Sequence, residues 1–118
     1  MGTFTINIQV GDLAGQQFIE VEALVDTGST YTVLPTDLLF RLGVSPLESR
    51  PFRLGDERLV EYPIGEARLR LDGRQLTAVV VFAQEGTGPV VGATTLENFG
   101  LGVDPIGRRL IPVPTLLK

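Results

Sequence analysis

The sequence predicts an all-β protein of one domain over residues 1–118, with one or two short helices. Three observations lead to this fold class. Apolar residues mostly alternate with polar ones, as in strands that bury one face. Turn-forming residues separate these segments, and Asp72-Gly73 is a strong signal for a two-residue hairpin. Only Thr36–Leu42 and Ala93–Gly100 have the start or stop signals of helices.

The composition fits a globular protein and excludes several kinds of chemistry. A chain of 118 residues with 43% hydrophobic content can bury a core without disulfides or metals. The net charge is −4 and no basic patch is visible, which argues against a nucleic-acid partner. Cysteine and histidine are absent, so carboxylates are the main acid–base candidates and no cofactor or metal is expected. Without a bilayer-length apolar run or a signal peptide, we expect a cytoplasmic protein with no membrane partner.

The first half of the chain is predicted to form strands, one short helix and a hairpin. The helix is expected over Thr36–Leu42, with leucines on its buried side and Gly43 as its stop. The expected hairpin tip is Gly55-Asp56-Glu57, where few apolar residues tie it to a core, which suits a mobile lid. An exposed polar hairpin is the alternative. The predicted strands are Thr3–Val10, Gln17–Val25 and Thr30–Leu34, followed by a loop at Ser45–Pro51 and the hairpin Phe52–Ile64.

The second half is predicted to add a hairpin, a helix and two short strands. The apolar run Ala78–Ala83 is expected to be buried on both faces. In the helix Ala93–Gly100, Thr94 and Glu97 are predicted to form a capping box. Pro112 lacks an amide donor, which places the last strand at an edge. The predicted strands are Glu66–Leu71, Arg74–Ala83, Val90–Val91, Leu101–Asp104 and Arg109–Val113.

The stretch Ala23–Thr30 is the strongest candidate for chemistry. An apolar strand ends at Asp26, and a tight turn through Thr27 and Gly28 follows at once. Gly28 can adopt backbone angles that other residues avoid and allows a close approach. A partly buried carboxylate is costly unless it has hydrogen-bond donors or a proton. The alternative is an aspartate that only stabilises its own turn.

Taken together, these motifs resemble the retropepsin-like aspartic proteases, in particular their single-domain microbial members. The resemblance rests on Asp26-Thr27-Gly28-Ser29 after an apolar strand, then a hairpin, then Val90-Val91-Gly92 before a short helix. The order and spacing match over nearly the whole chain. The resemblance implies a closed β-barrel of the acid-protease type, an aspartic endopeptidase that hydrolyses peptide bonds, and a hairpin that acts as the flap over the substrate.

The resemblance also assigns roles to individual residues. The chain has one Asp-Thr-Gly, so the second catalytic carboxylate would be Asp26 of another copy in a homodimer. Thr27 would hydrogen-bond across the dimer interface, and Gly28 would offer its backbone to the peptide. Ser29 would hydrogen-bond an outer carboxylate oxygen. The expected substrate contacts are Leu24, Val33, Leu54, Gly55, Asp56, Val90 and Val91.

Two positions depart from the retroviral members of this family. Those enzymes brace the dimer with an ion pair between an acid after the catalytic turn and an arginine after the apolar-apolar-Gly motif. Thr30 and Ala93 stand at these positions here, so this dimer must be braced otherwise. We expect the chain ends, Thr3–Ile8 and Leu110–Pro114, to contribute to the subunit contact.

Two other functions remain open from the sequence. The first is a dimeric peptide-binding or interaction module with the same fold, in which Asp26 has only a structural role. The second is an unrelated small β-barrel adaptor in which Asp-Thr-Gly is only a turn. Physiological substrate and cleavage preference cannot be read from the sequence.

Overall fold

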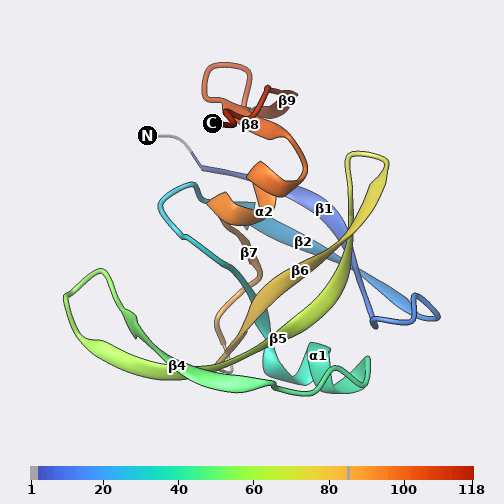
Figure 1. Cartoon of the computed structure of the whole chain (residues 1–118), viewed down its shortest axis with the longest axis vertical. Helices are drawn as coiled ribbons and strands as arrows, with labels where there is room; N and C mark the ends of the chain where they lie inside the picture. The colour runs from blue at the N-terminus through green and yellow to red at the C-terminus, as the bar shows by residue number, and fades with distance from the viewer. Residues whose placement is uncertain (1–2, 85) are drawn as a thin grey trace.

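The computed structural model describes residues 3–84 and 86–118, and its elements follow the predicted order closely (Figure 1). The strands are β1 (Phe4–Gly11), β2 (Phe18–Val25), β3 (Thr32–Pro35), β4 (Glu48–Arg53), β5 (Leu59–Leu71), β6 (Arg74–Ala83), β7 (Val90–Val91), β8 (Leu101–Asp104) and β9 (Arg109–Pro112). The helices are α1 (Thr36–Arg41) and α2 (Ala93–Asn98). The predicted all-β class with two short helices is confirmed.

The main sheet closes on itself. Its strands follow the order β1-β2-β7-β3-β6-β5-β4, and β1 also pairs with β5, so a closed ring forms with β4 outside it. The β2–β7 and β3–β6 pairs are parallel, and β3–β7 is antiparallel. Strands β8 and β9 form a separate hairpin beyond α2, while β4 and the start of β5 form an arm that reaches away from the ring (Figure 1). This arrangement is the closed sheet that the sequence predicts.

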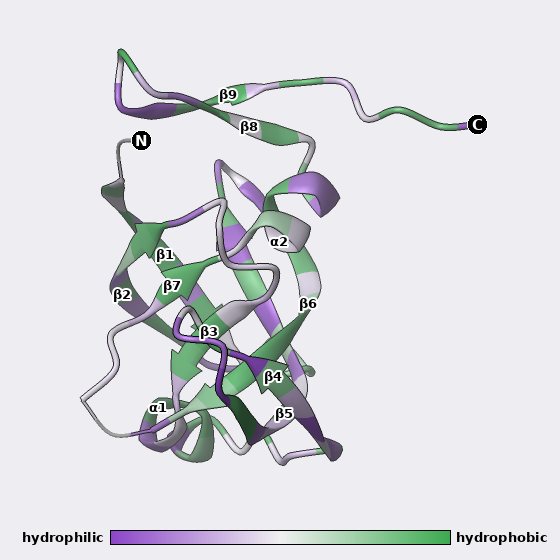
Figure 2. Cartoon of the chain, turned by 90° about the vertical axis from the view of Figure 1, so that its left-hand side faces the viewer, coloured by the Kyte–Doolittle hydropathy of each residue, from purple (hydrophilic) through white to green (hydrophobic). Residues whose placement is uncertain are grey.

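A single apolar core fills the ring. Alternation along β1 buries Phe4, Ile8 and Val10, while Thr5 and Asn7 face outward. Apolar residues are prominent along β1, β3 and β7 (Figure 2). The largest fully buried side chains are Phe82, Phe99, Ile8, Leu34, Leu39 and Leu69. The hairpin turn at Asp72-Gly73 has positive φ at both residues, 55° and 75°, as the sequence predicts.

Strand β4 begins inside the segment predicted as a loop. Glu48 to Pro51 pair with β5, with Pro51 opposite Glu61. The prediction of a loop over Ser45–Pro51 is therefore wrong for its second half. An edge strand needs amide donors only on its paired side, so an exposed proline such as Pro51 is tolerated there.

The expectation that Ala78–Ala83 is buried on both faces holds except at Val79. Ala78 and the residues from Val80 to Ala83 are buried, but Val79 is 37% exposed. Val79 lies opposite the exposed Glu66 on the outer side of the sheet. Further along the strand, the ring of Phe82 packs against Phe40 of α1, at a centroid distance of 6.0 Å. Phe82 lies on the core face of β6 with Ala78 and Val80, whereas Val79 lies on the opposite face, so this helix contact does not cover Val79.

The predicted capping box of Thr94 and Glu97 is not formed. The N-cap of α2 is Gly92, and no side chain caps the helix. The free amides of the first turn are satisfied from elsewhere, since Ala93 and Thr94 donate to the carbonyl oxygens of Ser29 and Thr30 at 2.7 and 3.0 Å. A contact distant in sequence therefore takes the place of the local cap.

The C-terminal hairpin is organised by Asp104. One carboxylate oxygen accepts hydrogen bonds from the amides of Ile106 and Gly107, both at 3.1 Å, and Arg109 lies 3.4 Å from the other oxygen. The Gly107 and Ile106 amides and the Arg109 guanidinium together lower the pKa of Asp104 below its ordinary value. Strand β9 is an edge strand, as Pro112 predicts.

Within residues 3–84 and 86–118, no helix has the length and apolar character that crossing a membrane requires.

Candidate active site

Asp26 lies at the point where β2 ends beside β7. Its amide donates to the carbonyl of Val91 at 3.0 Å, and its own carbonyl accepts from the amide of Ser29 at 3.1 Å. The amide of Gly28 donates to the carboxylate oxygen Oδ1 at 2.9 Å. The turn therefore holds one carboxylate oxygen in place. Asp26 is half-buried, while Thr27 and Gly28 are exposed, so the carboxylate lies close to the surface of the chain.

The backbone around this turn is packed against the start of α2. A side chain at Gly92 would collide with the carbonyl of Tyr31 and would lie 2.7 Å from the carbonyl oxygen of Ser29. Only glycine fits between β7 and α2 at this distance. The resemblance to the protease family implies a close approach at Gly92, and the structure has it, which places the Asp26 turn directly on the helix start.

Two buried threonines support the same junction. Thr32 on β3 and Thr95 on α2 are 0% and 2% exposed, and their hydroxyl oxygens lie 2.6 Å apart. The amide of Gly92 donates to the hydroxyl oxygen of Thr32 at 3.1 Å. Buried polar groups are costly when unpaired, so this network ties β3, β7 and α2 together. No local pattern predicts this pairing, because the two threonines are 63 positions apart.

A pocket of about 390 Å³ lies between the Asp26 turn and the β4–β5 hairpin. Among the described residues that line it, Asp26 is the one carboxylate and Arg53 the one cation. Val33, Val81 and Ala83 contribute apolar surface from the ring. The lining also includes Gly28, Ser29, Thr30, Tyr31, Phe52, Leu54, Gly55, Tyr62, Gln84 and Thr87. A pocket of this kind suits an apolar side chain held next to a carboxylate.

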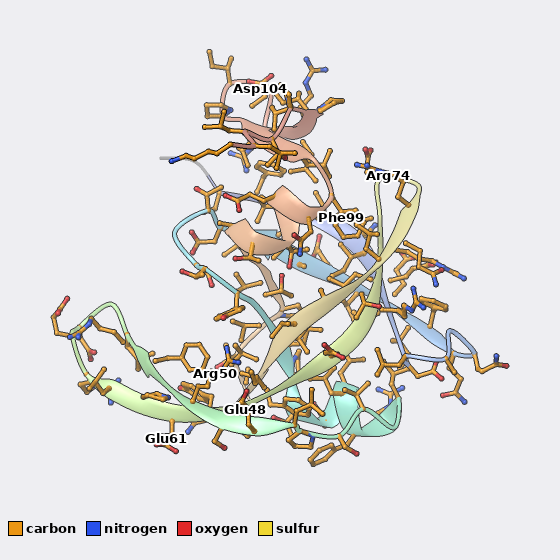
Figure 3. All side chains as sticks on the ribbon, viewed as in Figure 1. Glu48, Arg50, Glu61, Arg74, Phe99 and Asp104 are labelled. Carbon is orange, nitrogen blue, oxygen red and sulfur yellow. The ribbon has the colours of Figure 1, made fainter. Side chains whose placement is uncertain are left out.

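The side of the hairpin that faces the pocket is aromatic. The ring of Phe52 on β4 lies 5.8 Å from Tyr31 in an edge-to-face contact and 6.2 Å from Tyr62 on β5. Arg50 lies on the inner side of the arm and Glu61 on the outer side (Figure 3). The tip at Gly55 to Glu57 is exposed, as the sequence predicts.

The structure brings several of the predicted site residues together. Val33, Leu54 and Gly55 line the pocket with Asp26. Leu24 and Val90 are half-buried and pair with each other next to Val33, just beyond the lining.

Three other predicted residues have different surroundings. Val91 is fully buried in the core. Asp56 receives hydrogen bonds from the amide and the side chain of Arg58 at the hairpin tip. The hydroxyl of Ser29 donates to the carbonyl oxygen of Tyr31 at 2.7 Å, so its single proton is directed there and not at the Asp26 carboxylate.

Sequence reasoning missed Tyr31, Phe52 and Tyr62 as pocket residues. A signal for the hairpin was available, because polar and apolar residues alternate from Phe52 to Leu54 and from Val60 to Tyr62. That pattern predicts a strand with one buried face, but not the surface that this face covers.

The closed sheet, the Asp26 turn and the glycine junction at α2 define the fold of the retropepsin-like aspartic proteases. The sequence matches the aspartyl protease family over residues 6–104, and the chain belongs to that family. No protein with a curated description matches the sequence.

Several solved structures share the fold at low sequence identity. The EIAV protease complexed with the inhibitor HBY-793 is 19% identical, with a TM-score of 0.55 over 84% of this chain and 89% of that chain. A retropepsin-like aspartic protease from Rickettsia conorii is 16% identical, with a TM-score of 0.52 over 88% and 89%. A Legionella pneumophila protein of unknown function is 13% identical, with a TM-score of 0.55 over 91% and 92%. These likenesses establish the fold, and the family match excludes the unrelated adaptor.

Proposed function

We propose that this protein is an aspartic endopeptidase that acts as a homodimer with one active site. The observation that carries the proposal is the placement of Asp26. It is fixed on an exposed turn beside an apolar pocket, and the described lining of that pocket holds no other carboxylate. A second copy related by a two-fold axis would bring its own Asp26 turn against the first, because such contacts are self-complementary.

The proposed chemistry is general acid–base hydrolysis by two carboxyl groups. Two carboxyls in contact cannot easily both ionise, so they share one proton. The ionised Asp26 would take a proton from water, whose oxygen attacks the peptide carbonyl carbon. The protonated Asp26 would give its proton to the carbonyl oxygen, which forms a neutral tetrahedral intermediate. Breaking the C–N bond then needs a proton on the leaving nitrogen, which the first carboxyl returns, while the second carboxylate takes back a proton from a hydroxyl of the intermediate.

The pocket and hairpin would hold the peptide in an extended form. Leu54 and Gly55 lie on the arm above the pocket, and Val33 lies at its base. Leu24 and Val90 would extend the apolar surface beside it. Val91 would act from beneath by supporting the turn, and Asp56 by shaping the hairpin tip. An extended peptide between a turn and a hairpin can be recognised through its backbone and alternate side chains.

The subunit contact is proposed to involve the Asp26 turn and the chain ends. Thr27 is exposed and free to meet its counterpart across the two-fold axis. Thr30 and Ala93 hold the positions of the retroviral ion pair, so other surfaces must contribute. Thr3–Ile8 and Leu110–Pro114 remain the proposed candidates.

A peptide-binding module without proteolysis would use the same pocket. The aromatic and apolar lining favours peptide capture whether or not cleavage follows. The two functions differ in what Asp26 must do. In a binding module the carboxylate only stabilises its turn through the Gly28 amide.

The test is cleavage of a mixed peptide library by the full chain and by Asp26→Asn, from mildly acidic to neutral pH. The asparagine can still accept the Gly28 hydrogen bond, so the fold and the dimer should persist. We expect cleavage by the wild type, inhibition by a statine-type compound, and a loss of activity of at least about 10³-fold in the variant. Equal cleavage by both proteins would refute the catalytic role, and peptide binding without cleavage would favour the binding module.

A further inference from the structure

We propose that Tyr31 and Arg50 form a latch that ties the base of the β4–β5 hairpin to the Asp26 turn. Tyr31 is then a positioning residue, which sets where the hairpin stands over the pocket. The inference rests on the proposed peptidase function for its kinetic consequences. Its structural part concerns the hairpin alone.

The latch is a hydrogen bond between two segments that are distant in sequence. The Nη1 of Arg50 on β4 donates to the hydroxyl oxygen of Tyr31 at 3.1 Å. The Nη2 of the same guanidinium donates to Glu48 at 2.9 Å, so both sides of the fork have acceptors. Glu48 and Tyr31 raise the pKa of Arg50 above its ordinary value, and the group stays charged throughout the working pH range. Figure 3 shows Glu48 and Arg50 next to each other at the base of the arm.

Tyr31 is anchored on the catalytic side of this contact. Its carbonyl oxygen accepts the hydroxyl proton of Ser29 at 2.7 Å and packs against Gly92. The next residue, Thr32, belongs to the buried threonine pair. The backbone of Tyr31 is therefore fixed to the same junction that holds Asp26, while its side chain reaches toward the hairpin.

The outer part of the hairpin has few contacts with the rest of the chain. Beyond Phe52, the ion pairs of the arm are internal to it, between Arg53 and Glu57 and between Arg58 and Asp56. Both pairs are well exposed, and such pairs contribute little. On the inner side, the Arg50 hydrogen bond and the edge of Phe52 against Tyr31 join the arm to the Asp26 turn. Both contacts meet at Tyr31, which links the angle of the arm to this residue.

The variant Tyr31→Phe removes the hydroxyl and keeps the ring contact with Phe52. Loss of this charge-assisted hydrogen bond, at a half-exposed site, should lower the ratio of closed to open arm by about threefold to tenfold. Leu54 lines the pocket from the arm, so relaxation dispersion of its amide resonance measures the open population of the arm. We expect that open population to rise by the same factor, and KM for a cleaved peptide to rise similarly while kcat changes less than about twofold.

Arg50→Met and the double variant complete a cycle. If the two residues act through one bond, the double variant should resemble each single one, whereas independent effects would multiply. Tyr62→Phe is the matched control for the open population, because its hydroxyl has no hydrogen bond within the described part of the chain. Arg68→Met is the control for loss of a guanidinium. Arg68 lies at the end of β5 that is remote from the arm, where its guanidinium donates to the carbonyl oxygen of Leu13.

The latch is overturned if Tyr31→Phe leaves the open population measured at Leu54 at its wild-type value, or if Tyr62→Phe raises it equally. It is also overturned if the effects of Tyr31→Phe and Arg50→Met multiply in the double variant. A wild type that cleaves no peptide refutes the proposed function instead, and the open populations then still decide the latch. A wild type that cleaves peptides, with unchanged KM in Tyr31→Phe, refutes the positioning role alone.

Discussion

Replacing Thr32 by valine should weaken the junction beneath the catalytic turn. Valine has nearly the same shape, so the change removes the hydroxyl and little packing. The amide of Gly92 loses its acceptor, and the hydroxyl of Thr95 loses its partner 2.6 Å away. Both groups lie in a region where Thr32 and Thr95 are 0% and 2% exposed, so water does not readily replace the lost contacts.

The size of the effect follows from these two losses. A buried donor left unpaired costs about 1–3 kcal/mol, and the Thr95 hydroxyl adds up to about 1 kcal/mol because it can rotate. The total is about 1–4 kcal/mol, a large share of the usual 5–15 kcal/mol of a domain. For a chain of this size we expect the Tm to fall by about 10 °C.

Urea and thermal unfolding at one fixed protein concentration measure this change, since dimerisation would shift the midpoint. Thr95→Val should cost less than Thr32→Val, because Thr32 can still accept the Gly92 amide. The double variant should cost little more than Thr32→Val alone. Thr77→Val, on the exposed face of β6, is the control. A loss below about 0.5 kcal/mol in Thr32→Val, or a larger loss in Thr95→Val, would refute the assigned network.

Two further predictions concern the C-terminal hairpin. Because the pKa of Asp104 is lowered in the folded chain, its contribution to stability is present above the ordinary value near about 4 and is lost as pH falls through the folded pKa. The protection factor of the Gly107 amide, its exchange rate compared with that of an unstructured chain at the same pH, should therefore fall in acid, and Asp104→Asn should abolish that fall; an unchanged protection profile contradicts it. Truncation after Gly107 removes β9, and we expect monomers by analytical ultracentrifugation; an unchanged dimer argues against a role for the C-terminal end.

Local patterns predicted most of the fold. Alternation placed β1, β2 and the second half of β5, an apolar run placed β6, and the pair Asp72-Gly73 placed one turn, because these features depend on neighbouring residues only. The prediction of two separate segments on either side of Gly65 was wrong, since β5 runs unbroken from Leu59 to Leu71. The prolines near β4 suggested a loop, since their tolerance depends on β4 being an edge strand. The capping box failed because the carbonyls of Ser29 and Thr30, far away in sequence, satisfied the α2 amides first.

The candidate site likewise has features that the local sequence predicts and features that depend on contacts between distant segments. The Asp26 turn was predictable from the apolar strand and the small residues that follow it, whereas the close approach at Gly92 followed only from the resemblance to the family, since a buried strand ending in glycine is common. The aromatic lining formed by Tyr31, Phe52 and Tyr62, and the Tyr31–Arg50 hydrogen bond, could not be predicted. They depend on how the hairpin arm is folded over the turn. The burial of Val91 was equally hidden, since an apolar residue beside a turn fits a pocket and a core alike.

Subunit mixing tests the central claim most directly, that one catalytic centre needs Asp26 from two chains. Wild type and Asp26→Asn are unfolded together in equal amounts, refolded, and assayed on a cleaved peptide against wild type alone. If both carboxyls are required, only pairs of wild-type chains cleave, and the activity per total protein falls to about one quarter. An activity near one half would mean that each chain cleaves on its own, and it would contradict the shared site.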